Sequence, residues 1–132
     1  MKDFFEGDST RWEDFYHRDR VEANMYWART RAGVRLIDRF VPSKGRVLEI
    51  GSGPGHLSHA LIERDYDVIS CDIALRMAEL TRMRTKSDSV VVADSRSLPF
   101  RSASFDAIIL IGVISYVSNP TSVLEEIRAL LK

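Results

Sequence analysis

Residues 47–61 read VLEIGSGPGHLSHAL: a short apolar run, three glycines at alternate positions, and then a segment with helical spacing. This pattern predicts a strand over 47–50 and a helix that begins at His56. Glycine reaches positive φ easily and lets the backbone approach a ligand, because it has no Cβ. The stretch therefore predicts a strand, a tight glycine turn and a helix, with the turn as a candidate ligand site.

Strands and helices alternate along the rest of the chain. Further segments with strand or helix character lie at 68–71, about 75–84, 90–93, about 105–111, and from Pro120 behind Asn119 as N-cap. Such alternation predicts an α/β fold, a doubly wound and mostly parallel Rossmann-like sheet with right-handed crossovers. We expect four strands.

The residues before the first strand predict helices. Thr10 and Glu13 form a candidate capping box for a first helix. A second helix is expected over 22–40, with apolar positions that include Met25, Leu36, Ile37 and Phe40. We expect one compact domain, with a helical cap over residues 1–45 and a ligand-binding core over 46–132.

Composition restricts the partners of the chain. Lys plus Arg and Asp plus Glu are both 19, so the basic surplus typical of nucleic-acid binders is missing and such a partner is not expected. No apolar run approaches the roughly 18 residues of a membrane span, and the N-terminus is too acidic for a signal peptide. The single cysteine, Cys71, excludes an internal disulfide and suits a reducing compartment. The chain is predicted to be cytoplasmic.

Four clusters of residues follow the ends of the four expected strands. They are the glycine turn that begins at Gly51, then Asp72, Asp94 and Gly112. In a parallel sheet, ligands bind outside the carboxyl ends of the strands, so these clusters are expected to meet. A glycine turn with two carboxylates suits a nucleoside-like ligand. Each cluster alone is equally compatible with an ordinary strand-to-helix turn.

The spacing of the glycines separates the nucleotide classes. The dinucleotide fingerprint G-x-G-x-x-G/A fails, because His56 stands at its sixth position. No G-x-x-x-x-G-K-[ST] phosphate loop is present either. The chain instead carries Glu49-x-Gly51-x-Gly53-x-Gly55. A nicotinamide-dependent oxidoreductase is therefore a weak alternative.

This E-x-G-x-G-x-G pattern resembles motif I of the class I S-adenosylmethionine-dependent methyltransferases. Later segments resemble the type-11-like small-molecule branch of the same family in the same order, namely CDIALRM (71–77), ADSRSLPF (93–100), SFDAIILIGVISYV (104–117) and EEIRALLK (125–132). Three positions depart from the family pattern: Ala74 replaces Ser, Ser95 replaces Ala, and Tyr116 stands where His is common.

The resemblance implies S-adenosyl-L-methionine as cofactor and a small molecule, such as a quinone, as methyl acceptor. By position, the glycine turn would pass under the methionine and ribose, with Glu49 holding the turn. Asp72 would bind the ribose hydroxyls, Ile73 would pack on the adenine, and Asp94 would accept from the adenine amino group. The full implied set of cofactor-binding residues is Glu49, Gly51, Ser52, Gly53, Asp72, Ile73, Met77, Asp94, Ser95, Ile111 and Gly112.

No catalytic residue is assigned, because methyl transfer depends mostly on alignment of the acceptor with the methyl carbon. Tyr116 could orient an acceptor, although packing against a helix is the favoured interpretation. His56 and His59 are interpreted as surface residues rather than metal ligands, so no metal is expected. Cys71 is expected to pack as a small hydrophobe. Five aromatic residues fall in the predicted N-terminal helices. Packing in the core is the favoured interpretation, and a place on the pocket wall is the alternative. They are Trp12, Phe15, Tyr16, Tyr26 and Trp27.

Family members continue past the helix that ends here at Lys132, so the chain is expected to be a C-terminally truncated member or a short form. The fourth strand, apolar on both faces, would then be a sheet edge. We expect it to pair with a second copy or a partner chain. The alternative function is a catalytically inactive S-adenosylmethionine-binding or interaction module.

Overall fold

The computed structural model describes residue 14 and residues 21–132. It contains a four-stranded sheet with the order β3-β2-β1-β4, and every strand pairing in it is parallel. The strands are β1 (Arg46–Ile50), β2 (Asp67–Asp72), β3 (Val90–Val92) and β4 (Ala107–Leu110). They alternate with α3 (Val21–Phe40), α4 (His56–Ile62), α5 (Leu75–Thr85), the short 3-10 helix η1 (Ile114–Tyr116) and α6 (Pro120–Leu130). The predicted α/β fold is confirmed.

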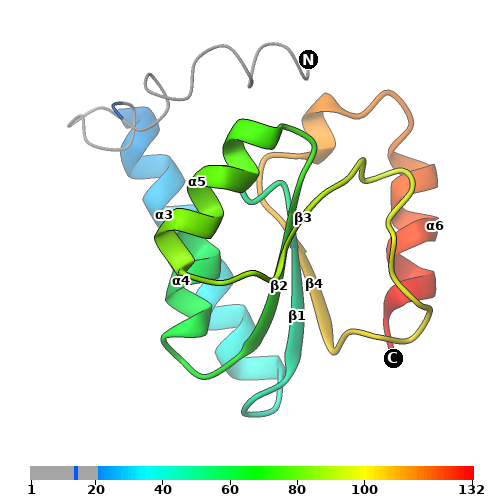
Figure 1. The fold of residues 1–132 in the computed structure, drawn as a ribbon, viewed down its shortest axis with the longest axis horizontal. Coiled ribbons are helices and arrows are strands. Elements are labelled where there is room, and N and C mark those ends of the chain that lie inside the picture. The colour runs from blue at the N-terminus through cyan, green and yellow to red at the C-terminus, as the bar shows by residue number, and fades with distance from the viewer. Residues whose placement is uncertain (1–13, 15–20) are drawn as a thin grey trace.

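Helices cover both faces of the sheet (Figure 1). On one face, Val34 and Ile37 of α3 pack with Leu57 and Leu61 of α4 over Val47 of β1. On the other face, α6 and the segment between β3 and β4 enclose a second apolar cluster that includes Leu48, Leu98, Phe105, Val123 and Ile127. The strands between these two layers are apolar because both of their faces are covered.

The buried face of α3 differs from the expected one. Of the predicted apolar positions, Ile37 is 5% exposed, but Met25, Leu36 and Phe40 are 50%, 55% and 70% exposed. Small and β-branched residues form the buried face instead, namely Ala23, Thr30, Val34, Ile37 and Val41, the last lying just past the helix. The capping box at Thr10 and Glu13, and Trp12, Phe15 and Tyr16, lie outside the described residues.

Helix α6 begins as predicted, with Pro120 at its first position and the Asn119 side chain accepting from the amide of Ser122. Val123, Ile127 and Leu130 are buried against β1 and β2. Leu124 is 57% exposed, so the apolar stripe of α6 is narrower than its sequence suggests.

Strand β4 is an edge of the sheet within the described part of the chain. An uncovered edge strand was expected to expose its apolar side chains, but all four side chains of β4 are half-buried. Just before the first residue of β4, Phe105 forms a parallel bridge with Leu131, and the Lys132 amide donates to the Phe105 carbonyl at 3.0 Å. The last residues of the chain therefore lie alongside the segment that leads into β4.

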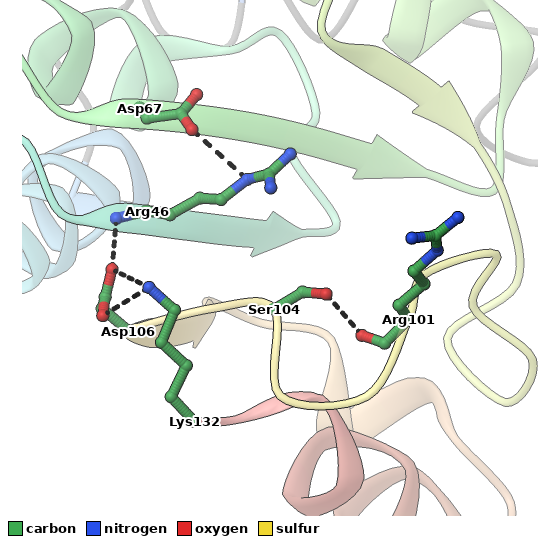
Figure 2. Close-up of polar contacts among 6 residues, drawn as sticks. All are labelled: Arg46, Asp67, Arg101, Ser104, Asp106 and Lys132. Carbon is green, nitrogen blue, oxygen red and sulfur yellow. Dashed lines mark hydrogen bonds and ion pairs between the residues drawn. The ribbon is translucent and has the colours of Figure 1, made fainter.

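Polar contacts join three strands at the edge of the sheet where the strands begin (Figure 2). The Asp106 carboxylate accepts from the Arg46 amide at 2.7 Å and from Lys132 Nζ at 2.9 Å. The Arg46 guanidinium lies 3.3 Å from the carboxylate of Asp67 in β2. The amide of Arg46 and the ammonium of Lys132 hold the pKa of Asp106 below its ordinary value. These contacts lie at the opposite end of β1 from its glycine turn.

Candidate cofactor-binding site

A cavity of about 560 Å³ opens at the carboxyl ends of the strands. This size falls in the range of roughly 300–1,000 Å³ that small-molecule sites occupy. Its wall contains residues from all four strand ends and from α3. Every residue of the predicted cofactor set lies on it: Glu49, Gly51, Ser52, Gly53, Asp72, Ile73, Met77, Asp94, Ser95, Ile111 and Gly112. The structure therefore brings the four sequence clusters together as expected, while their binding roles stay predictions.

Asp72 has a structural task that the sequence did not reveal. Its Oδ2 accepts from the amide of Gly53 at 2.8 Å, and its Oδ1 accepts from the amide of Ala74 at 2.9 Å. The carboxylate thus ties the glycine turn to the start of α5. A carboxylate offers about four acceptor positions, so one that holds backbone amides can also accept from a ligand. Asp72 is 8% exposed and lies on the cavity wall.

Packing inside the protein explains two of the three glycines in the turn. A Cβ on Gly51 would lie 2.2 Å from Val113 Cγ2, and one on Gly55 would lie 2.8 Å from Thr81 Cα, a backbone atom of α5. Both residues also have positive φ, which disfavours any other side chain. These positions need glycine because other elements approach them, whereas the sequence suggested the approach of a ligand.

Buried hydroxyls attach the glycine turn to α5. Ser52 Oγ lies 3.0 Å from Thr81 Oγ1, which in turn donates to the carbonyl of Gly53 at 2.8 Å. Arg84 Nε donates to the carbonyl of Pro54 at 2.7 Å. Ser52 is 1% exposed with its hydroxyl committed to α5, so its main chain is the part suited to a ligand.

Glu49 lies beneath the turn, 3% exposed, on the wall of the cavity. Ser58 donates to its carboxyl group, and Ser58 Oγ lies 2.6 Å from Ser70 Oγ on β2. Burial raises the pKa of Glu49 to about 8, against the smaller lowering effect of the bonds from Ser58. A carboxyl in this state keeps its proton over much of the neutral range.

Asp94 is paired with an arginine that the sequence analysis missed. Arg96 Nε donates to Asp94 Oδ1 at 2.9 Å, and its NH2 group lies 2.5 Å from Oδ2. These hydrogen bonds lower the pKa of Asp94, against the smaller opposing effect of burial. Both residues line the cavity. Asp94 and Arg96 are two residues apart in the same turn, so the D-x-R spacing in the sequence could have indicated this ion pair.

The wall beyond β4 is more apolar and more exposed. Ile111, Gly112, Val113 and Val117 line it together with Tyr116. A Cβ on Gly112 would meet no atom within 4 Å, so open space lies beside it. Tyr116 belongs to η1 and is 54% exposed, which corrects the favoured prediction of a strand-end tyrosine packed against a helix. Strand β4 ends at Leu110, so Tyr116 lies beyond the strand in which it was predicted.

Helix α3 contributes Met25, Tyr26 and Arg29 to the wall, and only Tyr26 was among the candidates. Trp27 instead contacts His56, with ring centroids 4.6 Å apart. His56 is therefore part of an aromatic contact rather than a free surface residue, and His59 lies 3.5 Å from Glu63. Among residues 14 and 21–132, no group of three or more acidic, histidine or cysteine side chains could hold a metal.

Cys71 is buried in β2, as predicted. Burial raises the pKa of its thiol to about 12, and the charge of Asp72 acts in the same direction. Such a thiol is not a nucleophile at neutral pH.

Comparison with known proteins assigns the family. A family model described as "Methyltransferase domain" matches residues 48–132. This span is more than half of the chain and includes the glycine turn and all four strand ends. The chain belongs to the methyltransferase domain family, in the class I S-adenosylmethionine-dependent group.

Individual relatives support this assignment. The demethylmenaquinone methyltransferase of Thermotoga maritima is 32% identical over 101 residues, which cover 75% of this chain and 43% of that protein. A solved S-adenosylmethionine-dependent methyltransferase of the same organism matches with a TM-score of 0.72 and 25% identity, over 100% of this chain and 57% of that one. Magnesium protoporphyrin IX methyltransferase from Synechocystis PCC 6803, solved with bound S-adenosylmethionine, shares the fold with a TM-score of 0.80 and 17% identity, over 99% and 70% of the two chains.

The chain spans less than half the length of the curated relatives that it matches. The span matched by the family model contains all four strand ends and most of the cavity wall.

Proposed function

We propose that this chain binds S-adenosyl-L-methionine in the cavity and is the cofactor-binding part of a methyltransferase that acts on a small molecule. The observation that carries the proposal is the juxtaposition around Asp72. One buried carboxylate holds the glycine turn, while apolar residues and a second carboxylate, Asp94, line the same cavity. This combination suits the polar ribose, the flat adenine and the positive sulfonium of the cofactor.

The residues present fit this ligand. Gly112 faces open space, and Ile73, which is 37% exposed, offers an apolar surface next to Asp72. Asp72 would hold the ribose hydroxyls, Ile73 and Met77 the adenine, and Asp94 with the Ser95 backbone the adenine amino group. Glu49 and the turn from Gly51 to Gly53 would hold the methionine side, next to Ile111 and Gly112.

When bound, the cofactor supplies an electrophilic methyl group on a sulfonium. The task of the protein is then to exclude water and to align an acceptor with that methyl group. Val113, Tyr116 and Val117 make an apolar wall at the edge of the cavity, which suits an apolar acceptor. The relative named as a demethylmenaquinone methyltransferase supports an acceptor of quinone type. The tyrosine hydroxyl of Tyr116 would orient its oxygen.

Calorimetric titration with S-adenosylmethionine and S-adenosylhomocysteine tests the proposal. Asp72→Ala should weaken both by roughly 10- to 100-fold, because the hydrogen bonds of a buried charged group contribute about 1–3 kcal/mol. Asp88→Ala, an exposed aspartate on the segment before β3, is the matched control. Thermal unfolding of both variants separates lost binding from lost folding. Unchanged affinity in a folded Asp72→Ala variant, or binding of NADH in place of these ligands, would contradict the proposal.

The open edge of β4 supports a second proposal. We propose that β4 pairs with the same strand of a second copy, because its backbone groups on that side face no strand in the described part of the chain. Light scattering at micromolar concentration should give the mass of a dimer. A monomeric mass together with rapid amide exchange along β4 would refute it.

The inactive-module alternative is not favoured by the family assignment, and methyl transfer to a quinone analogue tests it directly. The division into a cap over 1–45 and a core over 46–132 stays a prediction, as does the cytoplasmic location. No described helix is both long and apolar enough to span a bilayer.

A further inference from the structure

We propose that the outer face of α3 docks on the surface of an anionic lipid bilayer. This face carries two rows of exposed side chains, an apolar row of Met25, Leu36 and Phe40 and an arginine row of Arg31, Arg35 and Arg39. The inference goes beyond the proposed binding of the cofactor and does not depend on it. The family model begins at residue 48 and assigns nothing to this helix.

The apolar row leaves three large side chains in water. Met25, Leu36 and Phe40 are 50%, 55% and 70% exposed, whereas Val34 and Ile37 of the same helix are buried against the sheet. Leu36 follows Met25 after three helical turns, and Phe40 follows Leu36 after one turn, so the three fall on one side of the helix. Exposed apolar side chains that gather in this way mark a contact surface.

The arginine row runs beside the apolar row. Arg31, Arg35 and Arg39 are four residues apart, so they also share one side of the helix. All three are exposed, and none of them forms an ion pair with the residues that the structure describes. The guanidinium carbon of Arg39 lies 5.1 Å from the centre of the Phe40 ring, so the two rows are in contact at the end of the helix.

The positive charge of this face is not balanced nearby. The chain as a whole has 19 basic and 19 acidic residues, so the arginine row is a local excess. The one acidic residue close to the row, Asp38, lies 3.5 Å from Arg64 Nε and accepts from the Tyr66 hydroxyl at 3.2 Å. The carboxylate of Asp38 is therefore engaged on the side of α4, and the face calls for an anionic partner.

The two rows together favour a bilayer over other anionic partners. Lipid phosphates suit the guanidinium groups, and the acyl region just beneath them takes up leucine, methionine and phenylalanine side chains. A nucleic acid would use the arginine row but would leave the apolar row in water. No described helix is able to cross a bilayer, but a helix with such a face lies on its surface.

The face also borders the cavity. Met25 belongs to the apolar row and lines the cavity, as does Arg29, one turn further along α3. A bilayer on this face would therefore lie next to the cavity wall. An acceptor with a long apolar tail would then enter the cavity while its tail stays in the lipid. This last consequence alone rests on the proposed function.

Cosedimentation with lipid vesicles tests the docking. The unaltered chain should bind vesicles of equal parts phosphatidylglycerol and phosphatidylcholine at least about 10-fold more tightly than vesicles of phosphatidylcholine alone. Joint replacement Arg31→Gln, Arg35→Gln and Arg39→Gln should weaken binding to the anionic vesicles roughly 100-fold, about fivefold for each arginine. Leu36→Ser with Phe40→Ser should weaken it at least about 10-fold, because it removes the inserted apolar area.

A charge-matched variant is the control. Lys86→Gln, Arg101→Gln and Arg128→Gln remove the same charge from exposed positions outside α3 and should change vesicle binding by less than about 3-fold. Equal weakening in this control and in the arginine variant would mean that only net charge matters, which would overturn the proposal. Thermal unfolding of each variant confirms that it is folded.

Three further outcomes would also overturn the docking. They are failure of the unaltered chain to bind anionic vesicles, transfer RNA binding that needs the arginine row but not Leu36 and Phe40, and a dimer that dissociates in the Leu36→Ser, Phe40→Ser variant without lipid. None of the replaced residues lines the cavity, so calorimetry with S-adenosylmethionine should give the same affinity in every variant. Failure of the docking and failure of the cofactor proposal are therefore observed separately.

Discussion

The two sides of the cavity differ in how completely the chain builds them. On the side of β1, β2, α4 and α5, buried hydroxyls and carboxyls are bonded to one another, and no buried side-chain polar atom of the described residues lacks a partner. On the side of β4 and η1, the strand is half-buried, and Ile114 and Tyr116 are 39% and 54% exposed. The polar groups of the first side are thus held in place by hydrogen bonds, whereas the second side leaves apolar side chains exposed.

The largest expected effect comes from adding a single methyl group to the glycine turn, on the packed side of the cavity. Gly55→Ala should lower the free energy of unfolding by roughly 2–4 kcal/mol, because its Cβ would meet the backbone of Thr81 and its φ of 79° is strained for alanine. Gly112→Ala, with a φ of 73° but open space around it, should cost only about 1 kcal/mol. Urea unfolding of the two variants measures the difference.

The pair is informative because backbone strain is nearly the same at both glycines. A similar loss in both variants would mean that the turn is not tightly packed against α5. The contrast between the two sides of the cavity would then be wrong.

A smaller effect concerns the proton on Glu49. Its pKa is about 8 in the folded chain and 4.5 in a solvated reference, so the folded state keeps a proton that the unfolded state loses between these values. Stability from this source is present below about pH 4.5 and is lost as the pH rises through 8, by up to about 1 kcal/mol per pH unit between pH 5 and 7. Urea unfolding at several pH values measures the slope.

Glu49→Gln is the matched variant, because the amide oxygen can still accept from Ser58 while the group no longer titrates. Its stability should vary less across pH 5 to 7 than that of the unaltered chain. If both chains show the same slope, the carboxyl is already ionised beneath the turn, and the packed side is wetter than its burial indicates.

Much of the fold and of the site could be predicted because their signals are local in sequence. The strand before Gly51, the carboxylates at Asp72 and Asp94, and the N-cap at Asn119 each follow from a few adjacent residues. Parallel pairing then brings the strand ends together without further information.

The parts that could not be predicted depend on contacts between distant segments. Gly51 and Gly55 look like ligand-facing residues until Val113 and Thr81 are placed against them. Helix α3 carries apolar residues on more than one side, so Met25 and Leu36 could not be separated from Val34 by spacing alone. Nothing local in the sequence marked Arg29 as a wall residue, because one arginine among several on a helix is distinguished only by the cavity that it faces.

The lone thiol of the chain gives a built-in reporter. Cys71 lies at the centre of the sheet, shielded from water and from reagents in the folded state. Alkylation of this sulfur therefore requires the layer that covers it, α6 and the segment between β3 and β4, to move away from the sheet. The rate of its modification, followed by mass spectrometry with and without added nucleoside, would time how often the middle of the molecule opens and how far a ligand keeps it closed.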